Sequence, residues 1–342
     1  MHSHTWEPQY DSFSLLISIL VPVFCSIIIV IGVVGNLIVI IGVCRKRQLR
    51  NTPNILILGL AFADLSFIVM CVPFAAIRYR VDDWLFGEVW CTIMTFTQFS
   101  TASISVYTLV LMSLDRYLAI VHAISSKNIR TQRNAFISIA VTWLAGLTVN
   151  IPICLISNVY EFQLLNHHKA RCSITINWAK IVFANFFVFG YLIPLSIIVI
   201  LYGLTVKHLL YNVSACVSQS EESMRCRRRA SKMVAVIVIV FALSWLPLQI
   251  NFLYTSFKPK PSTKDSVIFL LVSQILCYSN SCMNPILYSF LSENFRREFH
   301  QVLCWRNKGR FSIISAVNIP KQCSENFSKS FCGFHAAHVK SV

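Results

Sequence analysis

The sequence predicts an all-α membrane protein, in which a bundle of seven transmembrane helices is followed by a short amphipathic eighth helix. Hydrophobic residues make up 56% of the 342 residues, and charged residues only 13%, against about 25% in soluble domains. Seven apolar stretches are separated by short polar or charged segments. Composition and pattern together favour a protein that crosses a membrane many times over a soluble globular domain.

The seven stretches each hold about 20 or more mostly apolar residues, the length that a helix needs to cross the hydrocarbon core. Because backbone amides in lipid must be paired within their own segment, each stretch is expected to be a helix. The predicted spans are Leu15–Cys44, Asn54–Tyr79, Glu88–Val121, Asn134–Ile156, Ala179–Leu210, Ser231–Phe257 and Asp265–Leu291. Residues 15–291 would form the membrane domain, after an extracellular segment 1–14.

The distribution of basic residues predicts how the chain is oriented. Most of the 30 lysines and arginines follow the first, third and seventh spans or lie between the fifth and sixth. The positive-inside rule makes that side cytoplasmic, with the N-terminus outside. The net charge of +16 then follows from topology rather than from a nucleic-acid-binding face. Segment 1–14 has no lysine or arginine, so the first span is expected to stay as a helix rather than be cleaved as a signal peptide.

Two of the 13 cysteines, Cys91 and Cys172, are the ones that this topology places outside the cell. Disulfides are rare in cytosol, so these two form the expected bridge. It would close a loop of about 80 residues and contribute roughly 4 kcal/mol in the chain-entropy model. Two unpaired outer thiols are the alternative.

Polar residues at membrane depth point to a cluster around Asp64, mid-way along the second span. A carboxylate there costs about 2.5–3.5 kcal/mol on insertion scales, so it is expected to face polar partners. The available partners in other spans are Asn36, Ser105, Asn280, Ser281 and Asn284. Asp64, Ser105, Asn280, Ser281 and Asn284 could hold an allosteric sodium ion through oxygen ligands; the alternative is a structural polar contact between helices.

Prolines in the second, fourth, fifth, sixth and seventh predicted spans are each expected to interrupt the helical hydrogen bonding. Such kinks are candidate hinges, and tolerated irregularity is the alternative interpretation. The prolines are Pro73, Pro152, Pro194, Pro247 and Pro285.

Short motifs occur in order, each on its own span. They include Gly35-Asn36, Leu60-Ala-Phe-Ala-Asp64, Asp115-Arg116-Tyr117, Trp143, Pro194, Phe241-Ala-Leu-Ser-Trp245-Leu-Pro247 and Asn284-Pro285-Ile-Leu-Tyr288. From Gly32 to Cys304 the chain thereby resembles a rhodopsin-like (class A) G-protein-coupled receptor. The resemblance implies a multi-pass plasma-membrane receptor, with no catalytic residues and no resident cofactor.

Within that family the chain looks most like the allatostatin-A and galanin neuropeptide receptors. The stretches that carry the likeness are Trp84–Cys91, Val106–His122, Ile129–Asn134 and Leu291–Arg296. The resemblance implies an amidated extracellular peptide, an inhibitory Gi/o-type heterotrimeric G protein, and contacts with arrestin, receptor kinases and membrane lipid. Opioid- or somatostatin-like peptide specificity is an alternative, as is a transporter, although neither repeats nor several intramembrane charges are visible.

The resemblance also implies roles for individual residues. G-protein coupling falls to Asp115, Arg116, Tyr117, Tyr202 and Tyr288, with Arg116 held by Asp115 in the inactive state. An activation switch would comprise Val106, Pro194, Phe241, Trp245, Pro247, Asn284 and Pro285. The alternatives are an ordinary ion pair at a helix end and ordinary core packing.

The third span carries Gln98 in its outer half and no carboxylate, which disfavours a cationic amine ligand. The seventh span has no lysine in its interior, which excludes a retinal Schiff base. A peptide pocket should present aromatic and amide side chains instead. The candidates are Phe74, Gln98, Thr101, Ala102, Phe187, Gln249, Phe252, Gln274 and Tyr278, for which helix packing is the alternative.

Beyond the seventh span, Phe295, Phe299 and Leu303 share one face, which predicts an interfacial helix over 292–304. Cys304 at its end is a palmitoylation candidate, before a cytoplasmic tail 305–342. The chain departs from the family pattern at Ala123, Arg227 and Ser244. Arg227 stands where some receptors carry an acid that pairs with Arg116, so that latch is not expected.

Overall fold

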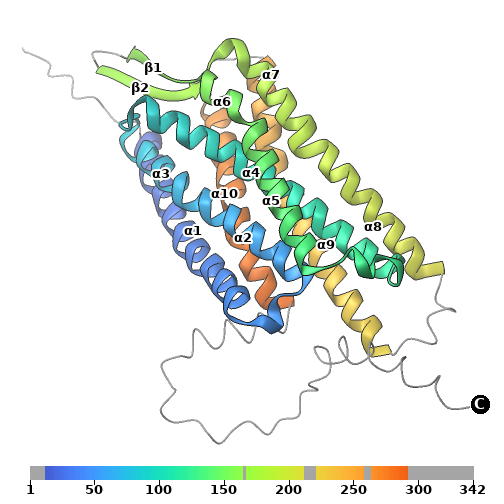
Figure 1. Cartoon of the computed structure of the whole chain (residues 1–342). Coiled ribbons are helices and arrows are strands. Elements are labelled where there is room, and N and C mark those ends of the chain that lie inside the picture. The colour runs from blue at the N-terminus through green and yellow to red at the C-terminus, as the bar shows by residue number, and fades with distance from the viewer. Residues whose placement is uncertain (1–11, 165–166, 212–220, 258–262, 292–342) are drawn as a thin grey trace, which may run out of the picture.

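The computed structural model describes residues 12–164, 167–211, 221–257 and 263–291 of the chain. Within these residues seven helices are long and apolar enough to cross a membrane, as the sequence predicts. Figure 1 shows them as one bundle with a two-stranded hairpin at one end. The predicted eighth helix, 292–304, and Cys304 lie outside the described residues.

Three of the seven spans are made of more than one helical segment. In chain order the spans are α1 (Ser12–Arg45), α2 (Thr52–Met70) with α3 (Val72–Val81), α4 (Gly87–Val121), α5 (Gln132–Val149) with α6 (Ile151–Ile156), α7 (Ile176–Phe187) with the π-helical turn η3 (Val188–Leu192) and α8 (Ile193–Tyr211), α9 (Glu221–Phe257), and α10 (Lys264–Leu291). Two short 3-10 turns, η1 (Arg47–Leu49) and η2 (Ser125–Asn128), lie in the connections. Helix α9 begins well before the predicted Ser231, because hydropathy marks the membrane-spanning part of a helix and not its end.

The prolines act in two different ways. Pro73 and Pro152 follow breaks at Cys71 and Asn150, and Pro194 follows the π-helical turn η3. Pro247 and Pro285 lie inside α9 and α10, which continue past them. The first helix also contains a proline, Pro22, that the sequence analysis did not single out. A proline inside a continuous helix removes one hydrogen bond, whereas Pro73 and Pro152 lie in the first turn of a new segment, where a backbone N–H would have no helical partner.

The connection between the fourth and fifth spans forms a β-hairpin, an element that the sequence pattern did not predict. Strands β1 (Ser157–Leu164) and β2 (His167–Ile174) are antiparallel, with Val159 opposite Cys172. Cys172 forms the predicted disulfide with Cys91 in the first turns of α4, with a Cα–Cα distance of 5.5 Å. We call this the disulfide end of the bundle, and the opposite end, which holds η2, the Asp115 end (Figure 1).

The hairpin is fixed to the helices by its outer edge as well as by the disulfide. The backbone N–H of Trp84 donates to the carbonyl of Ala170 at 3.1 Å, and the N–H of Ala170 donates to the Asp83 carboxylate at 2.7 Å. Lys169 also forms an ion pair with Asp82. The segment 82–84 thus covers the edge of β2, whose backbone groups would otherwise be unpaired.

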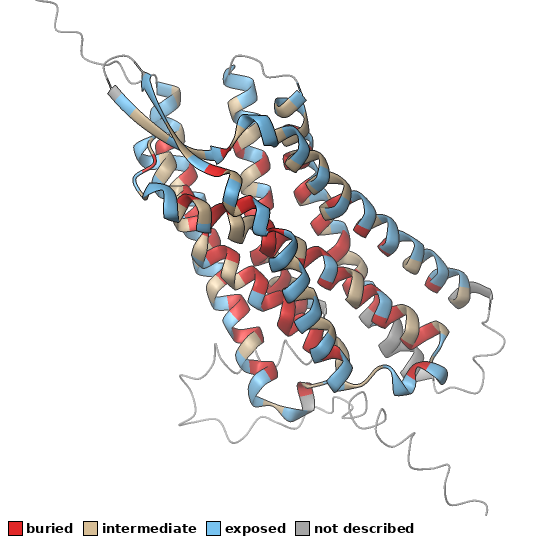
Figure 2. Ribbon diagram, turned by 45° about the horizontal axis from the view of Figure 1, so that its top comes forward, coloured by how far each residue is buried: buried red, intermediate tan, exposed pale blue. Residues whose placement is uncertain are grey.

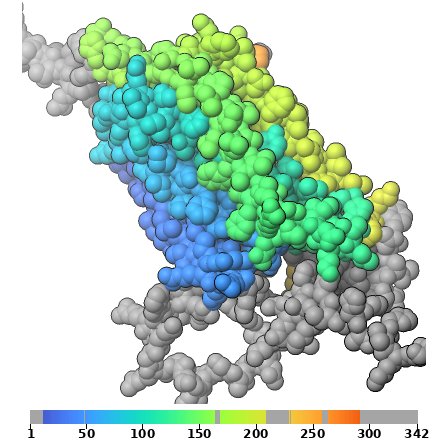
Figure 3. Space-filling model, viewed as in Figure 1, coloured from blue at the N-terminus to red at the C-terminus, as the bar shows by residue number. Residues whose placement is uncertain are grey.

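Burial in the bundle is highest around α2 and α4. Figure 2 shows the buried residues lining the interior of the bundle and the exposed ones its outer faces. Of the 18 most apolar consecutive residues in the span that contains α2, 72% are buried. The corresponding share in the span that contains α5 is 6%. In Figure 3, α5 and α6 lie across the front of the bundle. Their large exposed apolar side chains are those expected of a lipid-facing helix.

Close helix contacts depend on glycine. A Cβ atom on Gly35 of α1 would lie 2.8 Å from Pro285 of α10, and one on Gly146 of α5 would lie 2.5 Å from Ile104 of α4. Small residues let membrane helices approach each other closely, where dispersion contacts replace the hydrophobic driving force. Gly35 therefore positions α10, which carries part of the candidate site.

Candidate functional site

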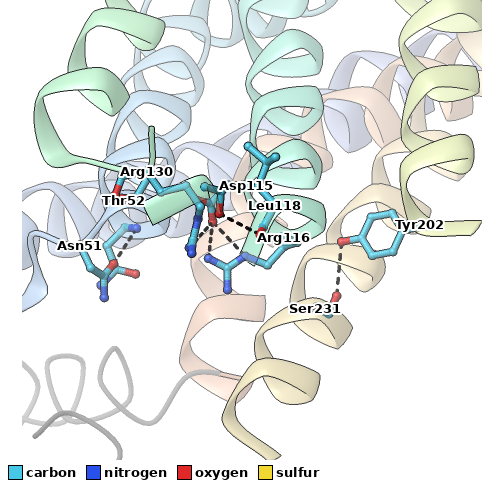
Figure 4. A network of polar contacts seen from close by, with 10 residues as sticks. Asn51, Thr52, Asp115, Arg116, Leu118, Arg130, Tyr202 and Ser231 are labelled. Atoms are coloured by element: carbon cyan, nitrogen blue, oxygen red, sulfur yellow. Dashed lines mark hydrogen bonds and ion pairs between the residues drawn. The ribbon is translucent and has the colours of Figure 1, made fainter. Parts of the chain in front are cut away.

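At the Asp115 end, the predicted pair between Asp115 and Arg116 is present. Arg116 Nε donates to Asp115 Oδ2 at 3.1 Å, and a second guanidinium nitrogen contacts the same oxygen. Figure 4 shows that a second arginine, Arg130, reaches the same carboxylate. Its Nε donates to Asp115 Oδ1 at 2.9 Å. Sequence reasoning missed Arg130, because nothing in the spacing links it to a residue fifteen positions earlier.

The three tyrosines assigned to coupling have different surroundings. Tyr202 on α8 donates to the carbonyl of Ser231 on α9 at 3.3 Å, so it joins two helices near Arg116 (Figure 4). Tyr288 on α10 is completely buried. The hydroxyl of Tyr117 lies 3.2 Å from His122 Nε2, just past the end of α4. Tyr202 and Arg116 are therefore brought together, whereas Tyr117, in the last turns of α4, contacts the first residue of the following connection.

The predicted polar cluster forms in the middle of the bundle. Asn284 Nδ2 donates to Asp64 Oδ2 at 2.8 Å, and Asn36 Nδ2 donates to the Ser281 carbonyl at 3.0 Å. The cluster thus joins α1, α2 and α10. All five residues assigned to the sodium site are buried, namely Asp64, Ser105, Asn280, Ser281 and Asn284.

The chemistry of this cluster fits a small hard cation. Its donors are carboxylate, hydroxyl and amide oxygens, which such cations prefer. The Asn280 side-chain oxygen is buried and has no hydrogen-bond partner within the described structure. Asn280 is one helical turn before Asn284, which binds the Asp64 carboxylate, and a bound cation or a water would satisfy its buried unpaired oxygen.

Three residues assigned to the activation switch, Val106, Phe241 and Trp245, lie in one hydrophobic cluster between α4, α8 and α9, whereas Asn284 and Pro285 lie on α10. Val106 is fully buried, and the rings of Phe241 and Trp245 lie 5.7 Å apart. Phe186 on α7 packs edge-on against Trp245 at 6.0 Å. Pro194, the second residue of α8, is also buried. Pro247 lies two residues beyond Trp245, inside the same helix.

The π-helical turn η3 adds two contacts that sequence reasoning did not find. Its Phe189 carbonyl accepts a hydrogen bond from the Tyr107 hydroxyl of α4 at 3.0 Å. Its Tyr191 hydroxyl donates to the Ala242 carbonyl of α9 at 2.8 Å. Such turns occur often at functional sites. The turn thus bonds to α4 at Tyr107 and to α9 at Ala242, the residues that directly follow the switch residues Val106 and Phe241.

The candidate ligand residues divide into two groups toward the disulfide end. On α9, Phe252 stacks on Phe183 of α7 with centroids 4.5 Å apart. Gln249, one turn before it, is buried, and its side-chain oxygen has no partner among the described residues. Phe187 stacks on Tyr191 at 6.0 Å. These aromatic and amide side chains lie on α7, η3 and α9, and the Phe183–Phe252 stack joins α7 to α9.

The second group lies between α3, α4 and α10. Phe74 contacts the rings of Phe86 and Trp90, and Gln274 accepts a hydrogen bond from the Tyr79 hydroxyl. Tyr278 is buried against Phe67. On α4, Gln98 is half-buried and Ala102 is buried, while the hydroxyl of Thr101 bonds to its own helix at Thr97.

Comparison with known proteins places this geometry in a family. A family model described as "7 transmembrane receptor (rhodopsin family)" matches residues 35–288. An allatostatin-A receptor of Bombyx mori is 40% identical over 291 residues, which cover 84% of this chain and 80% of the relative. A galanin-like G-protein coupled receptor of Caenorhabditis elegans is 36% identical over 85% of this chain and 75% of its own length. The galanin receptor type 2 of Rattus norvegicus is 33% identical over 92% of this chain and 83% of its own length.

Proposed function

Because the chain belongs to the rhodopsin family of seven-transmembrane receptors, we propose that it binds an amidated neuropeptide of the allatostatin-A or galanin type and activates an inhibitory Gi/o-type G protein. The family is one of G-protein-coupled receptors rather than enzymes. The observation that carries the peptide class is the 40% identity to an allatostatin-A receptor over most of both chains. The aromatic and amide side chains toward the disulfide end support it.

The disulfide end faces outward and the Asp115 end faces the cytoplasm in this proposal. The Cys91–Cys172 bridge supports this orientation, because disulfides persist in oxidising compartments. Basic residues at the other end support it too, including Arg45, Arg116 and Arg130. The peptide then meets the hairpin and the upper bundle, and the G protein meets the ends of α4, α8 and α9.

Activation is proposed to release Arg116 from Asp115. Peptide contacts near Phe252 and Gln249 would bias the cluster around Trp245, which is continuous with the packing against α4 and α8. Tyr202 and Tyr288 would then support the released Arg116 on the cytoplasmic side. A ligand acts here only through its preference for the active state.

A sodium ion bound by Asp64 and its neighbours is proposed to stabilise the inactive arrangement. The unpaired Asn280 oxygen and the Asp64–Asn284 contact support it. Arrestin and receptor kinases are proposed as further partners through the tail, and Cys304 as a palmitoylation site. The tail and Cys304 lie outside the described residues.

The test is to express the receptor and screen amidated peptides for nucleotide exchange on a panel of G proteins and for a fall in cAMP. We expect allatostatin-A- or galanin-like peptides to activate Gi/o. Silence to all of them, together with a response to an opioid- or somatostatin-like peptide, would overturn the ligand class. A response through another G protein alone would overturn only the coupling.

A further inference from the structure

Two arginines converge on the carboxylate of Asp115. Arg116 binds Oδ2 and Arg130 binds Oδ1, with Arg130 Nη2 also 3.5 Å from Oδ2 (Figure 4). The side chains of Asp115, Arg116 and Arg130 are only 5%, 10% and 16% exposed. The group therefore carries one excess positive charge in a largely dehydrated place, and the two guanidinium groups repel each other.

Arg130 is held in this position by the connection that carries it. Its backbone N–H donates to the Ser126 carbonyl at 2.9 Å, and the Ser126 hydroxyl donates to the Leu118 carbonyl of α4 at 3.0 Å. The Thr52 hydroxyl at the start of α2 donates to the Arg130 carbonyl at 3.4 Å. The connection after α4 is thus fastened to α4 and α2, and its guanidinium is aimed at Asp115.

The two arginines differ in what activation would do to them. Arg116 lies on α4 and faces Tyr202 of α8, so it is the one proposed to leave. If Arg116 left and no second arginine were present, Asp115 would be a buried carboxylate without a counter-ion, which is strongly unfavourable. Arg130 makes its shorter contact, at 2.9 Å, with Oδ1, which Arg116 does not bind, so its bond to Asp115 does not depend on Arg116 staying.

We propose that Arg130 is a positioning residue for signalling: it keeps Asp115 compensated when Arg116 departs, and so makes the active state more accessible. This inference rests on the proposed release of Arg116. It assigns to the connection after α4 a function in the switch itself, in addition to any contact with the G protein. The second arginine also competes with Arg116 for the carboxylate, which weakens the inactive pair.

The test compares Arg130→Ala with wild type by nucleotide exchange on the G protein, with and without peptide. We expect Arg130→Ala to lower peptide-independent exchange and to raise the half-maximal peptide concentration about tenfold, the scale of one charge-assisted hydrogen bond. Arg130→Lys, which keeps the charge but not the fork, should fall in between. Arg133→Ala is the matched control, because Arg133 lies three residues on, is exposed and makes no ion pair within the described residues.

A double-mutant cycle with Asp115→Asn separates this role from a merely structural one. An amide needs no counter-ion, so Arg130→Ala should have no further effect in the Asp115→Asn background. An equal loss in both backgrounds, or no loss in either, would overturn the proposal. The peptide-independent arm does not require the correct ligand, so a wrong peptide class would leave this comparison intact.

Discussion

At the scale of residues, the buried carboxylates Asp115 and Asp64 are stabilised in different ways. Asp115 is compensated by two guanidinium groups, whereas Asp64 is bonded by the Asn284 amide and the Ser281 hydroxyl and, within the described residues, has no ion pair. A buried carboxylate without a counter-ion is expensive, which favours a cation at Asp64 and means that Asp115 needs at least one of its two arginines. Two predictions belong to these residues.

Arg116→Ala should abolish peptide-stimulated nucleotide exchange while the peptide dissociation constant changes by less than about threefold, under 1 kcal/mol. Arg130 still neutralises Asp115 in this variant, so the receptor should fold and reach the cell surface. The measurements are G-protein exchange and radioligand binding on the same membranes. Undiminished signalling would show that Arg116 does not couple to the G protein.

Replacing sodium with choline at constant ionic strength should raise peptide affinity about fivefold or more, since typical coupling between sites is of that size. The physical reason is that a cation held by Asp64 favours the arrangement with α2 and α10 joined through Asn284. Asp64→Asn should remove the sodium dependence. If wild-type affinity is the same in both salts, the cluster is a structural contact and not a sodium site.

At the scale of elements, the informative features are places where regular structure is interrupted or joined. The π-helical turn η3 frees the carbonyl that Tyr107 binds, and the hairpin is fixed by a disulfide and by the segment 82–84. Close packing of α4 on α5 depends on Gly146. Each of these joins segments that hydropathy treats as independent.

Cys172→Ala should lower the thermal stability and the surface expression of the receptor. Opening the bridge, which links residues 81 positions apart, removes roughly 4 kcal/mol in the chain-entropy model. Thermal unfolding in detergent and peptide binding measure the effect. Cys154→Ala is the control, since Cys154 is a free cysteine of α6. Equal behaviour of the two variants would argue against a structural role for the bridge.

Gly146→Ala should destabilise the bundle by about 1–3 kcal/mol, because the new Cβ would lie 2.5 Å from the Ile104 side chain. Thermal unfolding of the solubilised receptor measures it. Ile104→Ala removes the atoms that would clash, so the double variant should lose less stability than the sum of the single ones. Additive losses would mean that α4 and α5 do not approach as closely as described.

At the scale of the whole molecule, the burial pattern is that of a bundle with its polar groups inside. The outer faces carry large exposed apolar side chains, while Asp64, Asn280 and Asn284 are buried between helices. This is the reverse of a soluble helical protein, and it follows from a lipid environment in which only internal partners can satisfy polar groups. Membership of the rhodopsin family implies a multi-pass protein of the plasma membrane.

The proposed orientation predicts that an antibody reaches a tag at the N-terminus on intact cells and a tag at the C-terminus only after permeabilisation. The physical reason is the excess of lysine and arginine in the connections of the Asp115 end. Immunofluorescence with and without detergent is the measurement. A C-terminal tag stained on intact cells would reverse the orientation and remove the basis for coupling through Arg116.

The sequence by itself determined the number of spans, the disulfide partners and the residues around Asp64. Hydropathy over about 20 residues is a local property, and rare intramembrane polar residues identify one another because lipid offers no other partner. The tertiary structure decided what depends on contacts between distant segments: the hairpin, the attachment of η3 to α4 and α9, and the second arginine on Asp115. Arg130 looks like one more basic residue in a connection until the fold brings it to the end of α4, because an ion pair is set by distance in space and not along the chain.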